Sequence, residues 1–586
     1  MGILMKEKWM VKNKSADFKA IAGHFGISEV TARLLVNRGL NDFEAMGCYL
    51  APDISQLHDP QGMKDAGKAA GILAEKISEG KKIRIIGDYD VDGVVATYIF
   101  METLLECGAD VDYRIPERVR DGYGLNLRLV EEAAADGVDT ILTCDNGIAA
   151  VEQVDFAKEC GMCVVVTDHH ELQEQLPKAD ALVNPKQMDC SYPYKGLCGA
   201  AVAYKVAELI YGACGKEKGS AEKFIAFAAI ATVCDVMELT GENRTIVSLG
   251  LAALRSSTHC GIQALCAANG ITGEALDTYR LGFVLGPCIN ATGRLETAER
   301  GVKLLLSKDG QEAQEIAEKL KELNEIRRDM TAKGVQAAVK IVEEKGEPDR
   351  VLVVFLEDCH ESLAGIIAGR LRERYNRPAI VLTRTEGGLK GSGRSTGQYS
   401  MFEKLTECRE MLKQYGGHPM AAGLSLAEEN YLPLVSQLNE RCGLTEEDLT
   451  LKISIDAVLA LTGLSFSLVE ELNRLEPFGK GNEKPVFAER GLKLHRMTAI
   501  GKGRKMFRFL VEDAYGTQMD ALYFGDGEVL EEEMIARYGE DVVRGLYGGV
   551  DMGVRMSVVY YPSINEYRDK RTLQIVLQHI MWQDME

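Results

Sequence analysis

Short apolar runs alternate with amphipathic stretches over residues 81–190. Strands separated by helices of about 10–15 residues are typical of a parallel sheet with right-handed crossovers. Ligands of such sheets bind beyond the carboxyl ends of the strands. The runs predict strands at Lys81–Asp88, Val111–Ile115, 140–144 and 163–167, and the stretches between them predict helices at Val94–Cys107, Asn126–Asp136 and Ala149–Cys160.

The pattern changes further along the chain. Ala-rich helices extend from Ala200 to residue 300, and the long polar helix Gln311–Lys345 is typical of a bridge between two domains. A second α/β pattern follows, with strands at Val351–Leu356 and Ala379–Thr383 and a helix at Leu363–Tyr375. The C-terminal part predicts the strands of a small barrel of the OB type, at Thr450–Ile455, Val486–Arg496, Met506–Val511, Gln518–Phe524, Val554–Tyr561 and Gln574–Gln578.

A chain of 586 residues is too long for a single core, so we expect several domains. A stretch similar to a helix-turn-helix, Ile27–Leu35, is interpreted as part of an appended helical segment rather than as a DNA-reading unit. The predicted domains are a helical lead-in over 1–80, a parallel-sheet α/β domain over 81–310, a connecting helix over 311–346, a smaller α/β domain over 347–430 and an OB-type β-barrel over 450–586.

The composition limits the classes of function that are possible. The net charge of −20 would repel nucleic acid over a distance. An anionic substrate must therefore be held locally, by metal ions and by clustered Arg and Lys. No apolar run approaches the ~20 residues of a membrane span, and the N-terminus lacks a secretory signal. Fifteen cysteines scattered over a long chain are more typical of structural thiols than of disulfides. We therefore expect a cytoplasmic protein with no membrane segment.

Acidic and imidazole side chains follow three of the predicted strands. Asp88, Asp90 and Asp92 alternate in Gly-Asp-Tyr-Asp-Val-Asp-Gly at 87–93, Asp145 follows the strand 140–144, and Asp-His-His at 168–170 follows the strand 163–167. Several carboxylates and imidazoles at one sheet edge suit two hard divalent ions, and Mn²⁺ or Mg²⁺ better than structural zinc. Helix capping alone would need one aspartate, not three.

Together with further motifs along the chain, these residues make the sequence resemble the DHH phosphoesterases, and within them the RecJ single-strand-specific exonucleases. The resemblance covers nearly the whole chain. It rests on the 87–93 run, Ile-Pro-Glu-Arg at 115–118, Gly-Tyr-Gly-Leu at 122–125, Cys-Asp-Asn-Gly-Ile at 144–148, Thr-Asp-His-His-Glu at 167–171, Ala-Leu-Val-Asn-Pro at 181–185, Cys-Asp-Val at 234–236, Gly-Ser-Gly-Arg-Ser at 391–395, Gly-Gly-His-Pro-Met-Ala-Ala-Gly at 416–423 and Glu-Pro-Phe-Gly-Lys-Gly-Asn at 476–482.

The resemblance implies the following site. The metal ligands would be Asp88, Asp90, Asp92, Asp145, His169 and Asp235, with Asp145 bridging two Mn²⁺ or Mg²⁺ ions. His170 would meet the phosphate and Asp168 would support the histidines. In the smaller α/β domain, of the DHHA1 type, Ser392 and Arg394 would contact phosphate and His418 would lie near the scissile group. Arg118 and Arg370 are further candidates for contacts to the strand.

Two features complete the expected substrate contacts. In the barrel, Lys502, Arg504, Lys505 and Arg508 lie beside Phe507 and Phe509, and basic groups with aromatic rings hold single strands in such barrels. Strand alternation would place only one of these sets in a groove. In the stretch 286–294, Cys288 stands where related enzymes usually carry an arginine, so one contact to DNA is lost or supplied elsewhere.

We therefore expect a metal-dependent exonuclease that degrades single-stranded DNA, by resemblance from the 5′ end and in recombination and repair. We also expect a monomer, with a helicase and a single-strand-binding protein as partners. One alternative is a phosphodiesterase of short oligonucleotides or cyclic dinucleotides, which would use the same residues but would not need the barrel. Another is an inactive replication scaffold, although such a protein would have lost its acidic ligands.

Overall fold

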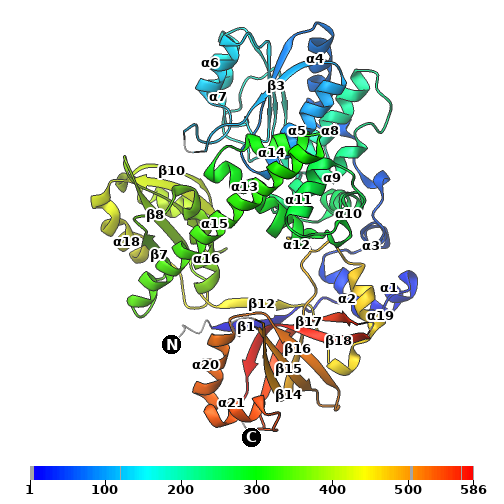
Figure 1. The fold of residues 1–586 in the computed structure, drawn as a ribbon, viewed down its shortest axis with the longest axis vertical. Coiled ribbons are helices and arrows are strands. Elements are labelled where there is room, and N and C mark those ends of the chain that lie inside the picture. The colour runs from blue at the N-terminus through cyan, green and yellow to red at the C-terminus, as the bar shows by residue number, and fades with distance from the viewer. Residues whose placement is uncertain (1–5, 119, 502–505, 569, 585–586) are drawn as a thin grey trace. The chain divides into compact units, whose positions relative to one another are not determined.

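The computed structural model describes residues 6–118, 120–501, 506–568 and 570–584. These residues form two compact units. The larger unit contains residues 52–449 together with 479–482, and the smaller unit contains the rest of the described chain. The predicted α/β architecture with a C-terminal barrel is confirmed (Figure 1). No helix in the described ranges is both long and apolar enough to cross a bilayer.

A five-stranded parallel sheet forms the centre of the first half of the larger unit, in the order β3-β2-β4-β5-β6. Cys144 of β4 pairs with Thr167 of β5, and Ile86 of β2 pairs with Thr143, so the carboxyl ends of these strands lie at one edge. The pattern predicted all strands except the three-residue β6. The strands are β2 (Lys82–Ile86), β3 (Asp110–Arg114), β4 (Thr140–Cys144), β5 (Cys163–Thr167) and β6 (Ala181–Val183).

Both faces of the sheet are buried, which explains why its strands are almost continuously apolar. Leu142 and Val165 belong to one hydrophobic cluster, whereas Ile141 and Val164 belong to another on the opposite face. The first cluster includes α4 (Ala66–Ser78), α5 (Val91–Glu106), α8 (Gly199–Ala213) and α9 (Ile225–Cys234). The second includes α6 (Leu127–Ala135) and α7 (Val151–Glu159). The sheet edge that carries the acidic residues is thus held between two cores.

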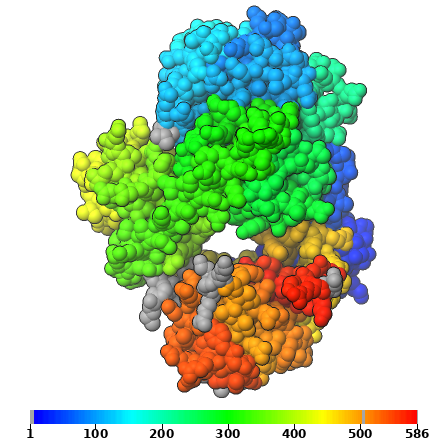
Figure 2. Space-filling model, viewed as in Figure 1, coloured from blue at the N-terminus to red at the C-terminus, as the bar shows by residue number. Residues whose placement is uncertain are grey.

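Further helices connect this sheet to the smaller α/β domain. They are α10 (Gly241–Arg255), α11 (Cys260–Ala268), α12 (Thr278–Arg280), the π-helical turn η5 (Leu281–Leu285), α13 (Gly286–Leu295), α14 (Glu299–Leu306) and the long α15 (Gly310–Glu344). The N-terminus of α15 lies within one residue of its predicted start because Asp309 caps it, accepting from the backbone of Gln311. Figure 2 shows the green surface of this helical region beside the yellow-green surface of the smaller α/β domain.

The smaller α/β domain contains strands that its sequence did not predict. Its sheet has the order β10-β11-β9-β8-β7. Glycine is rarely favoured in strands, yet Gly391 is required in β9 because a Cβ there would collide with the carbonyl oxygen of Val381 on β8. The elements are β7 (Leu352–Phe355), α16 (Ala364–Tyr375), β8 (Ala379–Thr385), β9 (Gly388–Arg394), α17 (Met401–Thr406), β10 (Leu412–His418), β11 (Ala421–Leu426) and α18 (Tyr431–Glu440).

The smaller unit contains a closed barrel in which β14, β15, β16, β18 and β17 pair in turn and β17 returns to β14. This is the strand order of an OB-type barrel. The predicted strand at 450–455 does not join it: β12 (Leu451–Ile455) pairs only with β1 (Glu7–Val11) among the described strands. The barrel strands are β14 (Phe487–Ile500), β15 (Met506–Glu512), β16 (Gln518–Tyr523), β17 (Arg555–Tyr567) and β18 (Lys570–Trp582), with α20 (Gly527–Tyr538) and α21 (Glu540–Tyr547) before β17.

Helices from the N-terminus share the core of this barrel. Leu34 and Leu35 of α2 are fully buried in the same cluster as Phe487 and Phe509 of the barrel. The helix-turn-helix-like stretch therefore uses its apolar face for packing. The remaining helices of the unit are α1 (Phe18–Phe25), α2 (Glu29–Asn37), α3 (Phe43–Leu50) and α19 (Phe466–Asn473), and β13 (Ala457–Val458) pairs with β14.

A buried ion pair joins α8 to α10 in the larger unit. Lys205 Nζ lies 2.8 Å from Glu242 Oε1, and their side chains are 1% and 0% exposed. Tyr192 donates to Glu242 at 2.8 Å, and Lys205 donates to the carbonyl of His58 at 2.8 Å. Because both charges are buried, loss of one would leave the other without compensation.

We predict that Lys205→Ala lowers the free energy of unfolding of the larger unit by about 3–5 kcal/mol, because Glu242 would keep a buried negative charge. Urea unfolding followed by circular dichroism measures the change. Lys308→Ala is the matched control, since Lys308 pairs with Glu102 but is 70% exposed, and it should cost less than about 1 kcal/mol. Equal effects of the two substitutions would contradict the prediction.

Candidate metal centre

The first acidic run lies where β2 passes into α5. Asp90 caps α5, with its Oδ1 accepting from the backbone N–H of Gly93 at 3.1 Å. The helix therefore begins at Val91, three residues before its predicted start at Val94, and Asp92 lies in its first turn. A Cβ at position 93 would lie 2.5 Å from the Asp88 nitrogen, so glycine is needed where the helix folds back over Asp88.

Asp92 is held by the N-terminus of a second helix. Its two carboxylate oxygens accept from the backbone N–H groups of Gly199 at 2.6 Å and Ala200 at 2.7 Å, at the start of α8. A helix N-terminus favours negative charge. A Cβ at Gly199 would lie 2.6 Å from the Cβ of Asp145, so this glycine lets α8 approach both aspartates.

Asp145 follows β4 in a left-handed backbone conformation, with a φ of 62°. The adjacent Asn146 fixes this turn, because its Nδ2 donates to the carbonyl of Ile86 at 3.0 Å and to that of Cys144 at 2.9 Å. Tyr123 donates to the Asp145 carbonyl at 2.7 Å. The ends of β2 and β4 are thereby joined, and the Asp145 backbone is held in a left-handed conformation of the kind found at functional sites.

The three residues after β5 have different environments. Asp168 Oδ2 accepts from the backbone of Ile148 at 2.9 Å, and Oδ1 accepts from the backbone N–H groups of His169 at 2.7 Å and His170 at 3.0 Å. Oδ1 also lies 2.8 Å from His170 Nδ1. His169 Nε2 lies 3.0 Å from Asp145 Oδ1. Asp168 thus connects the histidine turn to the loop after β4, whereas His169 faces the other aspartates.

The described residues contain three groups of side chains whose ligand atoms all lie within 4.8 Å of one another. Asp145 and His169 each belong to two groups, which makes neighbouring centres that share ligands. Asp168 belongs to none of them. The groups are Asp145 with His169 and His170, Asp92 with His169 and Asp235, and Asp88 with Asp90 and Asp145.

These residues fit divalent cations. Asp88 Oδ1 and Asp145 Oδ1 are buried and accept no hydrogen bond from any described residue. Burial and the charge of Asp90 hold the pKa of Asp88 well above its ordinary value, and burial and the charge of Asp92 do the same for Asp145. A divalent ion held by these carboxylates would offset their mutual repulsion, which adds to burial in raising their pKa values.

The two histidines differ in charge. Burial lowers the pKa of His169, which keeps the imidazole neutral as a metal ligand must be. Burial acts in the same direction on His170, but the hydrogen bond to Asp168 and the surrounding aspartates outweigh it and raise the pKa to about 9. His170 is therefore a cation at neutral pH in the metal-free protein.

Asp235 reaches the site from a distant part of the chain. It follows α9, and its Oδ2 lies 3.7 Å from His169 Nε2. The next residue, Val236, has a φ of 55°, which is rare for a β-branched side chain. Burial and the charge of Asp92 raise the pKa of Asp235 to about 8. Periodicity and composition gave no signal for this residue, and only the motif resemblance indicated it.

Arginines without carboxylate partners lie around the centre. The Arg118 guanidinium lies 3.8 Å from the ring centroid of Tyr89, which separates Asp88 from Asp90. Arg294 of α13 donates to the Ser362 carbonyl at 2.6 Å. Burial, followed by the charges of Arg118, Arg327 and Arg394, lowers the pKa of Arg294 to about 10. In the described chain none of these four arginines forms an ion pair with a carboxylate.

Sequence reasoning missed Arg294 and Arg327 as site residues. The glycine before Arg294 is the one sequence feature that relates to its position. A Cβ at Gly293 would collide with the carbonyl oxygen of Tyr89, so glycine allows α13 to pack against the acidic loop. Arg327 Nε donates to Asn324 at 3.1 Å, and Asn324 Nδ2 lies 3.5 Å from the sulfur of Cys288. Cys288 itself is fully buried.

The predicted phosphate contacts in the smaller α/β domain are placed differently from one another. Arg394 donates to Ser392 at 3.0 Å on β9, and a Cβ at Gly365 of α16 would lie 2.7 Å from its Nη2. Arg370 is exposed on α16 and donates to Glu373 at 3.0 Å. His418 is exposed at the end of β10. Arg394 and Ser392 are thus positioned by packing, whereas Arg370 and His418 are not.

The aromatic and basic residues of the barrel lie on different faces of β15. Phe507 and Phe509 are fully buried in the barrel core with stacked rings, so they are not a stacking surface for bases. Arg508 points outward on the same strand, with a half-exposed side chain. Lys502, Arg504 and Lys505 lie outside the described residues.

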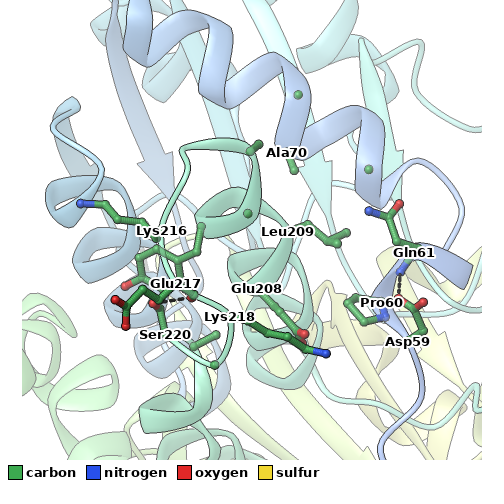
Figure 3. Close-up of a pocket in the computed structure, with 17 residues that line it drawn as sticks. Asp59, Pro60, Gln61, Ala70, Glu208, Leu209, Lys216, Glu217, Lys218 and Ser220 are labelled. Carbon is green, nitrogen blue, oxygen red and sulfur yellow. Dashed lines mark hydrogen bonds between the residues drawn. The ribbon is translucent and has the colours of Figure 1, made fainter.

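A cavity of about 390 Å³ lies elsewhere in the larger unit, between the C-terminal half of α8 and the start of α4 (Figure 3). Its walls include Gln61, Leu209 and Lys216. It contains none of the candidate ligands. The acidic sheet edge, not this cavity, is the candidate active site.

A parallel sheet with clustered Asp and His at its carboxyl edge, followed by a mixed α/β domain, defines a metal-dependent phosphoesterase of the DHH class. Residues 82–232 match the DHH family, N-terminal domain, residues 349–443 match the DHHA1 domain, and residues 455–579 match the RecJ OB domain.

The chain is 36% identical over 579 residues to the single-stranded-DNA-specific exonuclease RecJ of Bacillus subtilis (strain 168), with 98% of this chain and 70% of that protein covered. It is 30% identical to RecJ of Escherichia coli (strain K12), with coverages of 94% and 95%. The crystal structure of RecJ in complex with Mn²⁺ from Thermus thermophilus matches with a TM-score of 0.81 and 26% identity, over 98% of this chain and 80% of that one. The chain belongs to the RecJ family of single-stranded-DNA-specific exonucleases.

We predict that Asp168→Asn lowers the pKa of His170 in the metal-free protein from about 9 toward its ordinary value of about 6.5, because the carboxylate that stabilises the imidazolium is lost. His170 would then release its proton at a lower pH. Histidine-labelled protein titrated by NMR measures this pKa. Asp189→Asn, at an exposed aspartate paired with Lys64, is the control. An unchanged pKa in Asp168→Asn would show that other groups hold the proton.

Proposed function

We propose that this protein is a divalent-metal-dependent exonuclease that hydrolyses single-stranded DNA from the 5′ end, in recombination and repair. The observation that carries the proposal is the set of three neighbouring ligand groups, in which Asp145 and His169 each belong to two groups. The relatives are single-stranded-DNA-specific exonucleases, and one was crystallised with Mn²⁺. This arrangement suits a site for two neighbouring Mn²⁺ or Mg²⁺ ions.

The acidic cluster would hold the ions. Asp145 would bridge them, and the other ligands would be Asp88, Asp90, Asp92, His169 and Asp235. Ions in such a site lower the pKa of water and neutralise charge on the phosphoryl group. Asp168 would serve as a positioning residue, since Oδ1 holds the histidine turn and Oδ2 accepts from the backbone of Ile148 in the loop after β4.

Cationic side chains would hold the phosphate. His170, which is protonated at neutral pH in the metal-free protein, would contact the scissile group, and His418 would approach it from the smaller domain. Arg118 and Arg294 lie beside the acidic loop, whereas Arg394 extends from β9. A guanidinium group is a planar set of N–H donors, and where it is partly buried and lacks a carboxylate partner in the described chain it favours binding of an anion such as phosphate. Arg370 would contact the strand from the exposed face of α16.

The barrel supports a long substrate. We propose that basic residues of the barrel sequence, Lys502, Arg504, Lys505 and Arg508, bind the single strand, as barrels of this type do. The alternative, a phosphodiesterase of short oligonucleotides or cyclic dinucleotides, would leave the RecJ-type barrel without a role. We further propose a cytoplasmic monomer that receives single strands from a helicase and acts together with a single-strand-binding protein.

The direct test is a time course on single strands with one end blocked, with Mn²⁺ or Mg²⁺ supplied. We expect degradation when the 3′ end is blocked, none when the 5′ end is blocked, and little on duplex DNA.

Asp145→Asn should reduce the rate of degradation by more than about 100-fold. Loss of a group that only supports a metal ligand typically lowers activity about 10- to 100-fold, and loss of a ligand should lower it further. Asp189→Asn is the control. Degradation only from the 3′ end would overturn the polarity, and full activity of Asp145→Asn would overturn the site.

Arg394→Lys keeps the charge of the proposed phosphate contact but loses its planar fork. We therefore expect KM for a single strand to rise about tenfold, equivalent to about 1.4 kcal/mol, with a smaller change in kcat. Steady-state kinetics at fixed salt measures both constants. Arg384→Lys is the control, because Arg384 lies at the end of β8 and pairs with Glu428. Identical kinetics of the Arg394→Lys and wild-type enzymes would remove Arg394 from the phosphate contacts.

A further inference from the structure

A four-residue segment between α19 and β14 belongs to the larger unit, although the chain on both sides belongs to the smaller one. Gly479 and Asn482 form a tight turn: the Gly479 N–H donates to the Asn482 carbonyl at 3.0 Å, and the Asn482 N–H donates back at 3.1 Å. Leu239 donates its N–H to the Lys480 carbonyl at 2.7 Å. The turn is therefore fixed by its backbone against the segment that follows α9.

The two glycines of the turn show how close this contact is. A Cβ at Gly479 would lie 2.7 Å from Leu239 Cδ1. Gly481 has a φ of 74°, and a Cβ there would lie 3.2 Å from the Cβ of Glu238. The left-handed backbone of Gly481 favours glycine, and a Cβ at Gly479 would displace the end of the Leu239 side chain. Lys480, between them, is consequently held at a defined place although its side chain is exposed.

That place is close to the metal centre. Leu239 is four residues after Asp235, so their Cα atoms are at most about 14 Å apart even in a fully extended chain. The segment is not extended, because Met237 donates back to the Thr232 carbonyl at 3.1 Å. The positive charge of Lys480 lowers the pKa of Asp235, opposing the larger effects of burial and Asp92. The ammonium therefore lies within electrostatic reach of a candidate ligand.

The ammonium group has no partner in the described part of the chain. It makes no hydrogen bond, ion pair or ring contact there, in contrast to other lysines of the larger unit such as Lys186 and Lys390. An ammonium cannot ligate a cation, which excludes a role as a metal ligand. A flexible stem with three donors on a fixed backbone is suited to an anion that arrives beside Asp235, and a strand phosphate is such an anion.

We propose that Lys480 binds a backbone phosphate of the single strand on the Asp235 side of the metal centre. The inference rests on the proposed function and adds a binding residue to it. Lys480 would place the strand without taking part in bond cleavage. Its substitution should therefore weaken substrate binding and leave the metal site intact.

The test compares Lys480→Gln, Lys480→Arg and wild-type enzymes on a 5′-phosphorylated oligothymidylate with Mn²⁺. We expect KM to rise about tenfold in Lys480→Gln, the loss of one charge-assisted contact, with kcat nearly unchanged. The slope of log KM against log salt should decrease by about 0.7, as for one phosphate contact to a single strand. Lys480→Arg should restore both. Lys340→Gln is the matched control, at an exposed lysine of α15 paired with Glu344.

Mn²⁺ titration without DNA separates this role from an indirect one. Equal Mn²⁺ affinity in the Lys480→Gln and wild-type enzymes supports a contact to substrate. A changed Mn²⁺ affinity with an unchanged salt slope would overturn the inference, since Lys480 would then act only through Asp235. Unchanged KM and salt slope in Lys480→Gln, with active wild-type enzyme, would also overturn it. A wild-type enzyme that degrades no single strand would instead refute the proposed function, and the inference with it.

Discussion

Mutual repulsion among buried aspartates at one sheet edge is the constraint on which the larger unit depends. Asp88, Asp90 and Asp145 are forced together by strand register, and burial raises the pKa of each. Such a cluster is costly unless hydrogen bonds, helix N-termini or cations compensate it. The start of α8, which binds both oxygens of Asp92, supplies one part of the compensation, and the ligand geometry leaves room for divalent ions to supply the rest.

The local backbone around the cluster is organised by close approaches. Gly93, Gly199 and Gly293 each occupy a position where a Cβ would collide with the acidic loops. Asn146 joins two strand ends, and Asp168 fixes the histidine turn. These contacts hold the ligands before any ion binds, which reduces the reorganisation needed on binding. The same backbone contacts therefore position the acidic ligands and pack the surrounding loops and helices.

Positive charge is concentrated at the same place in a strongly acidic protein. The net charge of −20 cannot attract a polyanion over a distance. Within the described chain, Arg118, Arg294, Arg327 and Arg394 lack carboxylate partners. The turn that carries Lys480 is bound through its backbone to Leu239, four residues after Asp235. Recognition of a phosphodiester would thus depend on a few positioned cations together with the metal ions. A negative net charge combined with a few cations near the metal centre favours binding at this site over general affinity for nucleic acid.

Local sequence patterns were enough to predict the parallel sheet, the long helix α15 and the barrel, because apolar periodicity is a local feature. They also indicated that the candidate ligands at 88–92, 145 and 168–170 follow the ends of strands. They did not reveal the glycine-rich strands β9–β11, the pairing of β12 with β1, or the approach of Asp235, Arg294 and Lys480 to the aspartates. Glycine has low strand propensity, so only the close approach of neighbouring strands explains Gly391. Likewise, which loop meets which sheet edge depends on packing between segments far apart in the chain. Those contacts are visible only in the folded molecule, because no local pattern records them.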